Sequence, residues 1–379
     1  MKILVLSHEL PPIGGGGGRA AYDICKELAA QNHQITILTA HFQGLETREI
    51  QDGIEIYRIP SLRKEPYRAP ISAMGAYVLT GLWVGYRLIK KNKPDVIHAH
   101  FAVPAGALAW ILSVLTGIPY VLTAHLGDVP GGVPEKTGKW FRWIMPFTYM
   151  IWKRAKRVVA VSEYTRQLAL NHYDVNIQVI PNGADVATLR PVQIKVNQPP
   201  RLVFAGRFVI QKNPTAIVKI LSQLKNFNWH CTLIGDGPLF GDVKLEIEKY
   251  KMHDHFELLG WVTPEKVLDI FSQSDILFMP SLSEGLPVVG VQALAKGLAI
   301  VASNIGGFLD LVDNEKNGLL VNLEETDKFV FFLQKLVTDS NFLLTCRQMS
   351  LEKSLFFDIT RVVEQYQKIF MEISVIQTN

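Results

Sequence analysis

The segment from Ser283 to Gly307 reads Ser-Glu-Gly-Leu-Pro-Val-Val-Gly-Val-Gln-Ala-Leu-Ala-Lys-Gly-Leu-Ala-Ile-Val-Ala-Ser-Asn-Ile-Gly-Gly. A largely apolar run at 275–279, typical of a buried parallel strand, precedes it, and a helical pattern extends from its Gly-Leu-Pro turn to about Lys296. The turn at 285–287 leaves backbone N–H groups free at the start of the helix. Free N–H groups and the helix dipole together favour a phosphate, so we predict a ligand-binding turn in a parallel α/β sheet.

Glu284 stands beside this predicted phosphate site. A carboxylate accepts hydrogen bonds from the hydroxyls of a sugar or a ribose, so the pairing predicts a sugar phosphate as the ligand. The alternative is structural, because Gly-Pro turns open many helices and an exposed Glu at a helix start is a favourable cap. Taken alone, this segment leaves both interpretations open.

The motifs Ser-Glu-Gly-Leu-Pro, Ala-Leu-Ala-Lys-Gly and Val-Ala-Ser-Asn-Ile-Gly-Gly in this segment resemble the donor-site signature of retaining glycosyltransferases of family 4. In that family, two glutamates stand eight positions apart, the first near the donor sugar and the second on the nucleotide ribose. Glu284 occupies the first position here, and Gln292 occupies the second. Two helical turns separate them, so both can face one ligand. An amide still bonds a ribose hydroxyl but carries no charge, so this departure bears on nucleotide affinity and activity. The resemblance implies that Gly285, Leu286 and Pro287 also bind the donor.

The composition is that of an ordinary globular protein, with 48% hydrophobic and 20% charged residues, and the length of 379 residues predicts two domains. Cys25, Cys231 and Cys346 lie in or beside apolar segments without metal-ligand spacing, which fits buried thiols in a reducing cytosol. The apolar run at 1–7 is too short for a secretion signal and indicates a first strand. We therefore expect a cytoplasmic protein.

Strand-like runs alternate with helical patterns, which predicts parallel sheets with helices on both faces. The alternation breaks at 190–200, a polar stretch with prolines, which indicates a domain boundary. We predict an α/β protein with a first domain at 1–190, a second at 191–355 and a C-terminal helix at 356–379. The predicted strands are 2–7, 34–39, 95–98, 119–123 and 157–161 in the first domain, and 201–205, 229–234, 256–258, 275–279, 299–301 and 318–321 in the second.

A glycine-rich segment, Leu10-Pro-Pro-Ile-Gly-Gly-Gly-Gly-Gly-Arg19, follows the first predicted strand and precedes a helical pattern at 20–31. Five glycines often form a flexible linker, but a linker here would interrupt a strand–helix unit, whereas a loop lets backbone approach a ligand. We discount a dinucleotide site, because the glycines start late and the next strand ends without an acid for a ribose. The segment resembles the acceptor-side loop of the same glycosyltransferases, which implies that Gly16 lies on the acceptor side and that Gly17 and Gly18 approach the donor.

His100, His125 and Asp128 follow two predicted neighbouring strands, at the edge where sites form. A lone histidine is usually structural, but these three residues are predicted to lie close together. The family has Thr-x-His-Gly-x-Asp at this point, and this chain keeps His125 and Asp128 three positions apart. The resemblance implies that His125 contacts the donor sugar and that Asp128 lies on the acceptor side.

Arg207 and Lys212 lie in the loop after the predicted strand 201–205. Basic loop residues are generally just solvated. A guanidinium and an ammonium group at this place can also hold a diphosphate from the side opposite the Gly285 turn. The family uses a Gly-Arg-x(4)-Lys pair for this purpose, so the resemblance implies that both residues bind the donor.

Two segments of the N-terminal half raise the question of a membrane. The apolar stretch 71–89 approaches transmembrane length, but Arg87 within it and several small or polar residues favour a buried helix. Residues 1–190 contain 21 bases against 14 acids, net +7, and the remaining 39 − 21 = 18 bases and 35 − 14 = 21 acids give net −3. The segment 139–157 fits an anionic bilayer surface, or equally a core helix with solvated bases. It combines Trp140, Phe141, Trp143 and Trp152 with Lys139, Arg142, Lys153, Arg154, Lys156 and Arg157.

The resemblance covers nearly the whole chain and implies a GT-B fold, in which two Rossmann-like domains face each other across a cleft, with the acceptor site in the first and the donor site in the second. It implies a retaining hexosyltransferase that moves a sugar from a nucleotide-sugar donor to a carbohydrate or lipid-linked acceptor, with no nucleic acid partner. The net charge of +7 and the segment 139–157 predict that the protein is peripheral on the inner face of the membrane. The sequence has no Asp-x-Asp, so we expect neither a metal nor another cofactor. Two alternatives stay open, a nucleotide-sugar epimerase and a non-catalytic nucleotide-sugar-binding protein.

Overall fold

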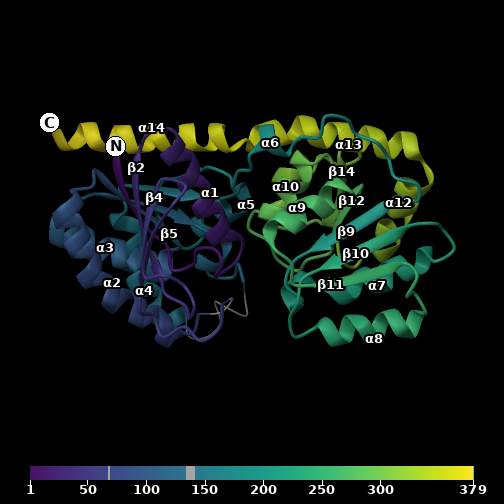
Figure 1. The fold of residues 1–379 in the computed structure, drawn as a ribbon, viewed down its shortest axis with the longest axis horizontal. Helices are drawn as coiled ribbons and strands as arrows, with labels where there is room; N and C mark the ends of the chain where they lie inside the picture. Colours follow the sequence, from purple (N-terminus) through teal and green to yellow (C-terminus); the bar gives the residue numbers. More distant parts are fainter. Residues whose placement is uncertain (67–68, 134–140, 379) are drawn as a thin grey trace. The chain divides into compact units, whose positions relative to one another are not determined.

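The computed structural model describes residues 1–66, 69–133 and 141–378, and for 141–143 and 375–378 it describes the backbone only. The chain forms two compact units: unit 1 contains Met1–Gly183 and Ile359–Asn379, and unit 2 contains Ala184–Asp358. Each unit has one sheet with helices on both faces (Figure 1). The prediction of an α/β protein with two doubly wound sheets is confirmed. The stretch 190–200 belongs to unit 2, and the division between the units falls before it, between Gly183 and Ala184.

Unit 1 has an eight-stranded sheet in the order β3-β4-β2-β1-β5-β6-β7-β8, and every neighbouring pair is parallel except β3 with β4. Strands such as β1 are buried along almost their whole length, because helices cover both faces, and their sequences are continuous apolar runs for that reason. The elements are β1 Lys2–Leu6, α1 Gly16–Ala30, β2 Gln34–Ala40, β3 Arg48–Gln51, β4 Ile54–Ile59, α2 Ile71–Asn92, β5 Val96–His100, α3 Ala107–Thr116, β6 Tyr120–Ala124, α4 Phe141–Arg154, β7 Arg157–Ala160, α5 Glu163–Leu170, β8 Ile177–Val179 and α14 Ile359–Thr378.

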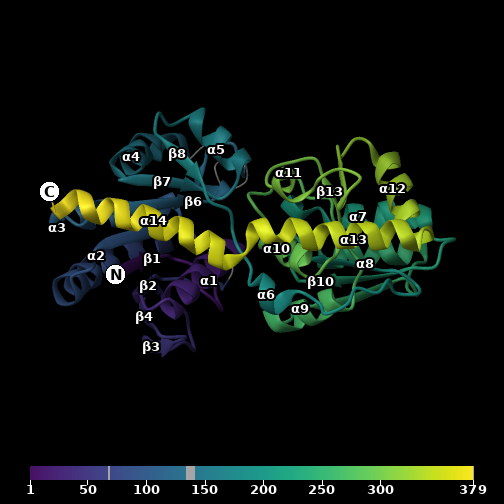
Figure 2. The same ribbon diagram turned by 90° about the horizontal axis from the view of Figure 1, so that it is seen from above.

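Two hydrophobic cores lie on the two faces of this sheet. On one face, Leu4 and Leu6 of β1 belong to a buried cluster with Leu88 of α2, Leu108 of α3 and Trp152 of α4. On the other face, α1 and α14 supply the cluster that includes residues such as Ile24 and Phe370. Figure 1 shows the strands between α14 and the group α2, α3 and α4, and Figure 2 views unit 1 from the side of α14.

Unit 2 has a six-stranded, fully parallel sheet in the order β11-β10-β9-β12-β13-β14. The order reverses between β9 and β12, as in the doubly wound nucleotide-binding fold. Its elements are α6 Val186–Leu189, β9 Arg201–Ala205, α7 Pro214–Leu221, β10 His230–Ile234, α8 Phe240–Tyr250, β11 Phe256–Gly260, α9 Pro264–Ser272, β12 Ile276–Met279, α10 Val288–Ala295, β13 Ala299–Ser303, α11 Phe308–Leu311, β14 Gly318–Val321, α12 Thr326–Thr338 and α13 Ser340–Ser354.

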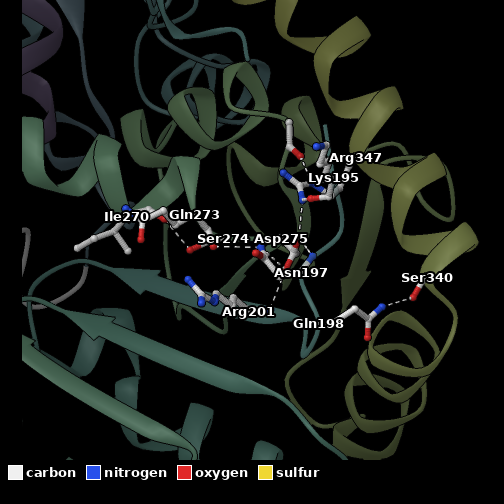
Figure 3. Close-up of polar contacts among 11 residues, drawn as sticks. Lys195, Asn197, Gln198, Arg201, Ile270, Gln273, Ser274, Asp275, Ser340 and Arg347 are labelled. Atoms are coloured by element: carbon white, nitrogen blue, oxygen red, sulfur yellow. Dashed lines mark hydrogen bonds and ion pairs between the residues drawn. The ribbon is translucent and has the colours of Figure 1, made fainter. Parts of the chain in front are cut away.

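A buried ion pair anchors the amino end of β12 in unit 2 (Figure 3). The carboxylate of Asp275 is fully buried and accepts a hydrogen bond from the guanidinium of Arg347 in α13. Arg347 also donates to the carbonyl of Gly297 at 2.7 Å and to that of Lys195 at 2.8 Å. The second Asp275 oxygen accepts from the backbone N–H of Arg201 at 2.8 Å. The pair therefore ties the segment that enters β9 to the start of β12. This contact lies at the end of the sheet opposite the loops that form sites.

Several details differ from the sequence-based expectations. The strands β3, β4 and β8 were not predicted, and α1 begins at Gly16 rather than at 20, so three of the glycines form its first turn. The predicted buried helix at 71–89 exists as α2, although part of it is exposed. Within the described residues, no helix has both the length and the apolar character needed to cross a bilayer.

The aromatic and basic segment 139–157 does not form the predicted surface in full. Lys139 and Trp140 lie outside the described residues, as do the side chains of residues 141–143. Trp152 is fully buried, and its ring stacks on that of Tyr173 with the centroids 4.3 Å apart. The prediction that Trp152 faces a membrane is therefore wrong, because α4 turns this side chain toward the sheet. Lys153, Arg154 and Lys156 are exposed.

Candidate functional site

The loops after β9 and β12 flank the point at which the strand order of unit 2 reverses, which is where doubly wound sheets bind ligands. The first loop carries Arg207 and Lys212, and the second carries Glu284. The ammonium of Lys212 lies 2.6 Å from Oε1 of Glu284, whose side chain is only 5% exposed. Arg207 is half-buried in the same loop. The structure thus brings Lys212 and Glu284 together, although they lie 72 positions apart in the sequence.

Backbone contacts hold the Glu284 loop in place. The N–H of Leu282 donates to the carbonyl of Gln211 at 2.7 Å, and the side-chain amide of Gln211 donates to the carbonyl of Ser283 at 3.0 Å. The Gly306-Gly307 pair packs directly against the loop: a Cβ on Gly306 would lie 1.9 Å from the Glu284 carbonyl oxygen. Glycine is therefore required at 306 and 307, because the two backbones approach each other too closely for a Cβ. This close packing keeps Glu284 beside Lys212.

The helix α10 begins with donors available for an anion. Pro287 is its N-cap residue, has no N–H and gives no side-chain cap. The N–H groups of Gly290 and Val291 donate to the Pro287 carbonyl. Within the described residues, this leaves the amides of Val288 and Val289 without a partner at the helix start, as the turn at 285–287 predicts.

Gln292 lies in the second turn of α10. It is half-buried, and its side chain makes no hydrogen bond within the described part of the chain. The buried hydroxyl groups of Ser281 and Ser303 were not singled out from the sequence. Ser281 follows β12, Ser303 ends β13, and both hydroxyls are fully buried with no hydrogen-bond partner in the part of the chain that the structure describes. The signal available for them was a serine at or just beyond the carboxyl end of an apolar strand.

In unit 1, His125 caps a short 3-10 turn, Leu126–Asp128, directly after β6. Asp128 is buried, and its two carboxylate oxygens accept from the backbone N–H of His125 at 2.8 Å and from that of Ala102 at 2.9 Å. Asp128 therefore links the carboxyl ends of β5 and β6. The backbone N–H of Asp128 donates to the carbonyl of His125 at 2.9 Å. Nε2 of the His125 imidazole is buried and has no partner among the described residues. A neutral imidazole that carries its proton on Nε2 would be a donor for a ligand oxygen there.

Burial keeps the histidines in this part of unit 1 uncharged. Burial is the main cause that lowers the pKa of His125 to about 4, with Glu9 partly opposing it and His8 adding a smaller lowering effect. Burial also lowers the pKa of His100 well below its ordinary value and that of His98 to about 3. At neutral pH, His125 is therefore a neutral hydrogen-bond donor and not a cation.

The glycine-rich segment packs against His125. A Cβ on Gly17 would lie 2.7 Å from the ring of Phe101 and 3.2 Å from Nδ1 of His125, so only glycine leaves room for these two rings, which stack at 4.4 Å. A Cβ on Gly18 would meet the backbone of Glu9 at 2.9 Å. Gly16 is exposed in the first turn of α1.

Phe101 is a site residue that the sequence reasoning missed. Its φ of 75° lies in the left-handed region, which is costly for a bulky side chain and is found where function holds the backbone. An aromatic directly after β5, the strand beside β1 at the switch point of unit 1, was the only signal for it. Among the described residues, no group of three or more His, Cys, Asp or Glu side chains is placed to hold a metal ion.

Comparisons with known proteins show the family and the fold of this chain. Residues 14–188 match the model of Glycosyltransferase Family 4, and residues 185–351 match that of Glycosyl transferases group 1. An uncharacterised glycosyltransferase of Methanocaldococcus jannaschii is 26% identical, and the alignment covers 99% of each chain. The UDP-Gal:alpha-D-GlcNAc-diphosphoundecaprenol alpha-1,3-galactosyltransferase of Escherichia coli is 24% identical, with 99% of this chain and 98% of that one covered.

Two solved structures share the fold. Sucrose-phosphate synthase from Thermosynechococcus elongatus has a TM-score of 0.85 at 18% identity, with 98% of this chain and 99% of that chain covered. Anabaena HepE in complex with UDP and glucose has a TM-score of 0.78 at 18% identity, with 98% and 100% covered. The two family models together span residues 14–351, and the chain therefore belongs to the GT-B glycosyltransferases of the family 4 type.

Proposed function

We propose that the protein is a metal-independent, retaining hexosyltransferase that moves a sugar from a nucleotide-sugar donor to a hydroxyl of a carbohydrate or lipid-linked acceptor. The observation that carries this proposal is the Lys212–Glu284 pair beside the uncapped start of α10, at the switch point of unit 2. A cation and two free amides suit a diphosphate, and a carboxylate suits the hydroxyls of a sugar. A nucleoside diphosphate sugar has both groups in one molecule.

The proposed roles follow from charge development during transfer. As the bond between the anomeric carbon and the diphosphate oxygen breaks, negative charge grows on the diphosphate. That charge would be stabilised by Lys212, Arg207 and the amides of Val288 and Val289. These donors are already in position, and preorganised donors contribute most where charge develops in the transition state. Glu284 would accept from a hydroxyl of the donor sugar. In unit 1, Nε2 of His125 would donate to a sugar hydroxyl. The leaving diphosphate would take the proton of the attacking acceptor hydroxyl, so no separate protein base is required.

The nature of the acceptor is proposed from the relatives and from charge. The E. coli relative is named for transfer to a diphosphoundecaprenol-linked sugar. Residues 1–190 of this chain carry a net charge of +7, which favours an anionic acceptor such as a lipid diphosphate. The sequence contains no Asp-x-Asp motif, so the proposed stabilisation of the diphosphate rests on side-chain cations and amides.

A panel of nucleotide sugars tests the proposal. Each is incubated with the protein, and thermal stabilisation and release of nucleoside diphosphate are measured. We expect at least one donor to stabilise the protein and to be hydrolysed slowly without an acceptor. A new epimer of the intact nucleotide sugar would instead identify an epimerase.

Stabilisation without turnover would favour a binding protein, an alternative to which Gln292 gives weight. A Gln292→Glu variant separates these cases. If the amide serves the ribose adequately, the variant should change nucleotide affinity by no more than about 1–2 kcal/mol and keep the same activity. Turnover by the Glu variant alone would show that the native chain only binds.

A further inference from the structure

Helices α2, α3 and α4 cover one face of the unit 1 sheet, and their outer sides expose large apolar residues. The inner sides are core, with Leu88, Leu108 and Trp152 in the buried cluster. Opposite them, Leu79 is 74% exposed, Trp83 is 64% exposed and Phe147 is 65% exposed, and the other exposed large apolar residues among the described side chains of these helices are Ile71, Tyr86, Val114 and Leu115. We call these outer sides the α2–α4 face. Among the described residues, seven large apolar side chains exposed on three adjoining helices indicate a binding surface.

The charged residues of the α2–α4 face are all basic. The three helices contain no Asp or Glu, although the whole chain has 35. The exposed bases are Arg87, Lys90, Lys91, Lys153 and Arg154. Two of them lie over aromatic rings of the same face: the guanidinium of Arg87 is 4.4 Å from the ring centroid of Trp83, and the ammonium of Lys90 is 5.4 Å from that of Tyr86. Apolar and cationic groups are therefore interleaved.

The spacing makes the combination continuous along α2. Leu79, Trp83, Arg87 and Lys90 follow each other at intervals of four, four and three residues, so they form one stripe on the helix. The stripe changes from aliphatic to aromatic to cationic toward the end of α2, where Lys90 and Lys91 also favour the negative end of the helix dipole. A helix that lies in the interface of a bilayer has this distribution of side chains.

We propose that the α2–α4 face docks on the surface of an anionic lipid bilayer. Leu79, Trp83 and Phe147 would enter the boundary between headgroups and acyl chains, and the five exposed bases would contact anionic headgroups. A second copy of this chain fits poorly, because two such faces would bring bases against bases. A nucleic acid would contact the basic side chains of this face but would leave its aliphatic side chains in water. The proposal does not depend on the donor chemistry of unit 2. It keeps Phe147, Lys153 and Arg154 of the segment 139–157 and extends the surface to α2 and α3.

Vesicle co-sedimentation tests the docking surface directly. The full chain is mixed with vesicles of phosphatidylcholine containing 30 mol% phosphatidylserine, and with pure phosphatidylcholine vesicles. We expect binding to the anionic vesicles at low salt that falls steeply as salt rises, because exposed charges are screened. The triple variant Arg87→Gln, Lys90→Gln and Lys91→Gln should bind at least tenfold more weakly. The variant Leu79→Ser with Trp83→Ser should also bind more weakly, without a change in charge.

A matched control removes three exposed bases from α1 and α14, on the opposite face of the same sheet: Lys26→Gln, Arg361→Gln and Lys368→Gln. The net charge changes by the same amount, and binding should fall less than threefold. Equal losses for the two triple variants would show that only net charge matters, and absence of binding of the native chain to anionic vesicles at low salt would also overturn the proposal. A dimer in solution that the Leu79→Ser and Trp83→Ser variant dissociates would assign the face to a second copy instead. All variants should keep the native unfolding transition and the native affinity for a nucleoside diphosphate, so loss of docking is distinct from loss of the donor site.

Discussion

The ammonium of Lys212 lies 2.6 Å from Oε1 of Glu284, and the side chains are 17% and 5% exposed. Each therefore neutralises the other at the carboxyl ends of β9 and β12. A nearly buried carboxylate depends on such a partner, because its desolvation is expensive when it stands alone. Lys212 is consequently poised between two anions, the carboxylate and the diphosphate that we propose as its ligand.

Replacing Lys212 by Ala should weaken binding of a nucleoside diphosphate by about 2–3 kcal/mol, the scale of a charge-assisted hydrogen bond lost in a partly closed site. Arg207→Ala should act in the same direction. Isothermal titration with UDP, GDP and ADP measures the effect. The control is Lys219→Ala, which removes a 53% exposed lysine from α7, and it should leave affinity unchanged. Native affinity in Lys212→Ala would remove this lysine from the donor site.

Gly17→Ala should lower turnover at least tenfold, because its Cβ would lie 2.7 Å from the Phe101 ring and would displace the ring that stacks on His125. Gly15→Ala is the matched control. A Cβ on Gly15 meets nothing within 4 Å, and its φ of −136° suits any residue. Donor hydrolysis rates compare the two variants. Equal rates would show that the spacing between Gly17 and the two rings has no bearing on the reaction.

Arg347→Ala should destabilise unit 2 by about 3–5 kcal/mol, because it leaves the fully buried carboxylate of Asp275 without its cation (Figure 3). The control lies on the same helix: Lys353→Ala removes the partner of Asp313, a carboxylate that is 48% exposed, and should cost less than about 1 kcal/mol. Urea unfolding followed by circular dichroism measures both. A small effect for Arg347→Ala would mean that water reaches Asp275.

Stability should depend on pH through the buried histidines. Since burial lowers the pKa of His125 to about 4, the unfolded chain binds more protons than the folded one between about pH 4 and the ordinary value of about 6.5. The contribution of His125 to the free energy of unfolding is therefore complete above about pH 6.5. It is lost as the pH decreases to about 4, and the loss is on the order of 3 kcal/mol. Urea unfolding at pH 7.5, 6 and 5 measures the fall. The His125→Phe variant should show a smaller change in the free energy of unfolding with pH. An unchanged pH dependence would contradict a lowered pKa for His125.

Much of the fold was predictable because its strands are buried on both faces. Continuous apolar runs such as those of β1 and β12 identify parallel strands without knowledge of their neighbours. The missed strands lack this signal: β3 is a polar edge strand paired antiparallel to β4, and β8 has three residues. The start of α1 was also misplaced, since three successive glycines give no helical preference and tertiary packing decides their conformation.

The candidate site was predictable in its residue types but not in its contacts. The motifs identify Lys212 and Glu284, yet no local rule pairs residues 72 positions apart. Trp152 shows the same limit, because Trp among bases suits both a membrane surface and a core, and only the packing of α4 on Tyr173 decides. Phe101 was missed because its role depends on a left-handed backbone that sequence does not reveal.

We propose that the protein transfers a sugar with retention from a donor held by Lys212, Arg207 and Glu284. Proton NMR of donor hydrolysis tests it most directly, with water acting as the acceptor and the free sugar observed before its anomers equilibrate. With an α-linked nucleotide sugar, we predict that the first free sugar to appear is the α anomer, released together with nucleoside diphosphate, and that Lys212→Ala slows its appearance. A β anomer appearing first, or no donor of the panel being consumed, would contradict the account.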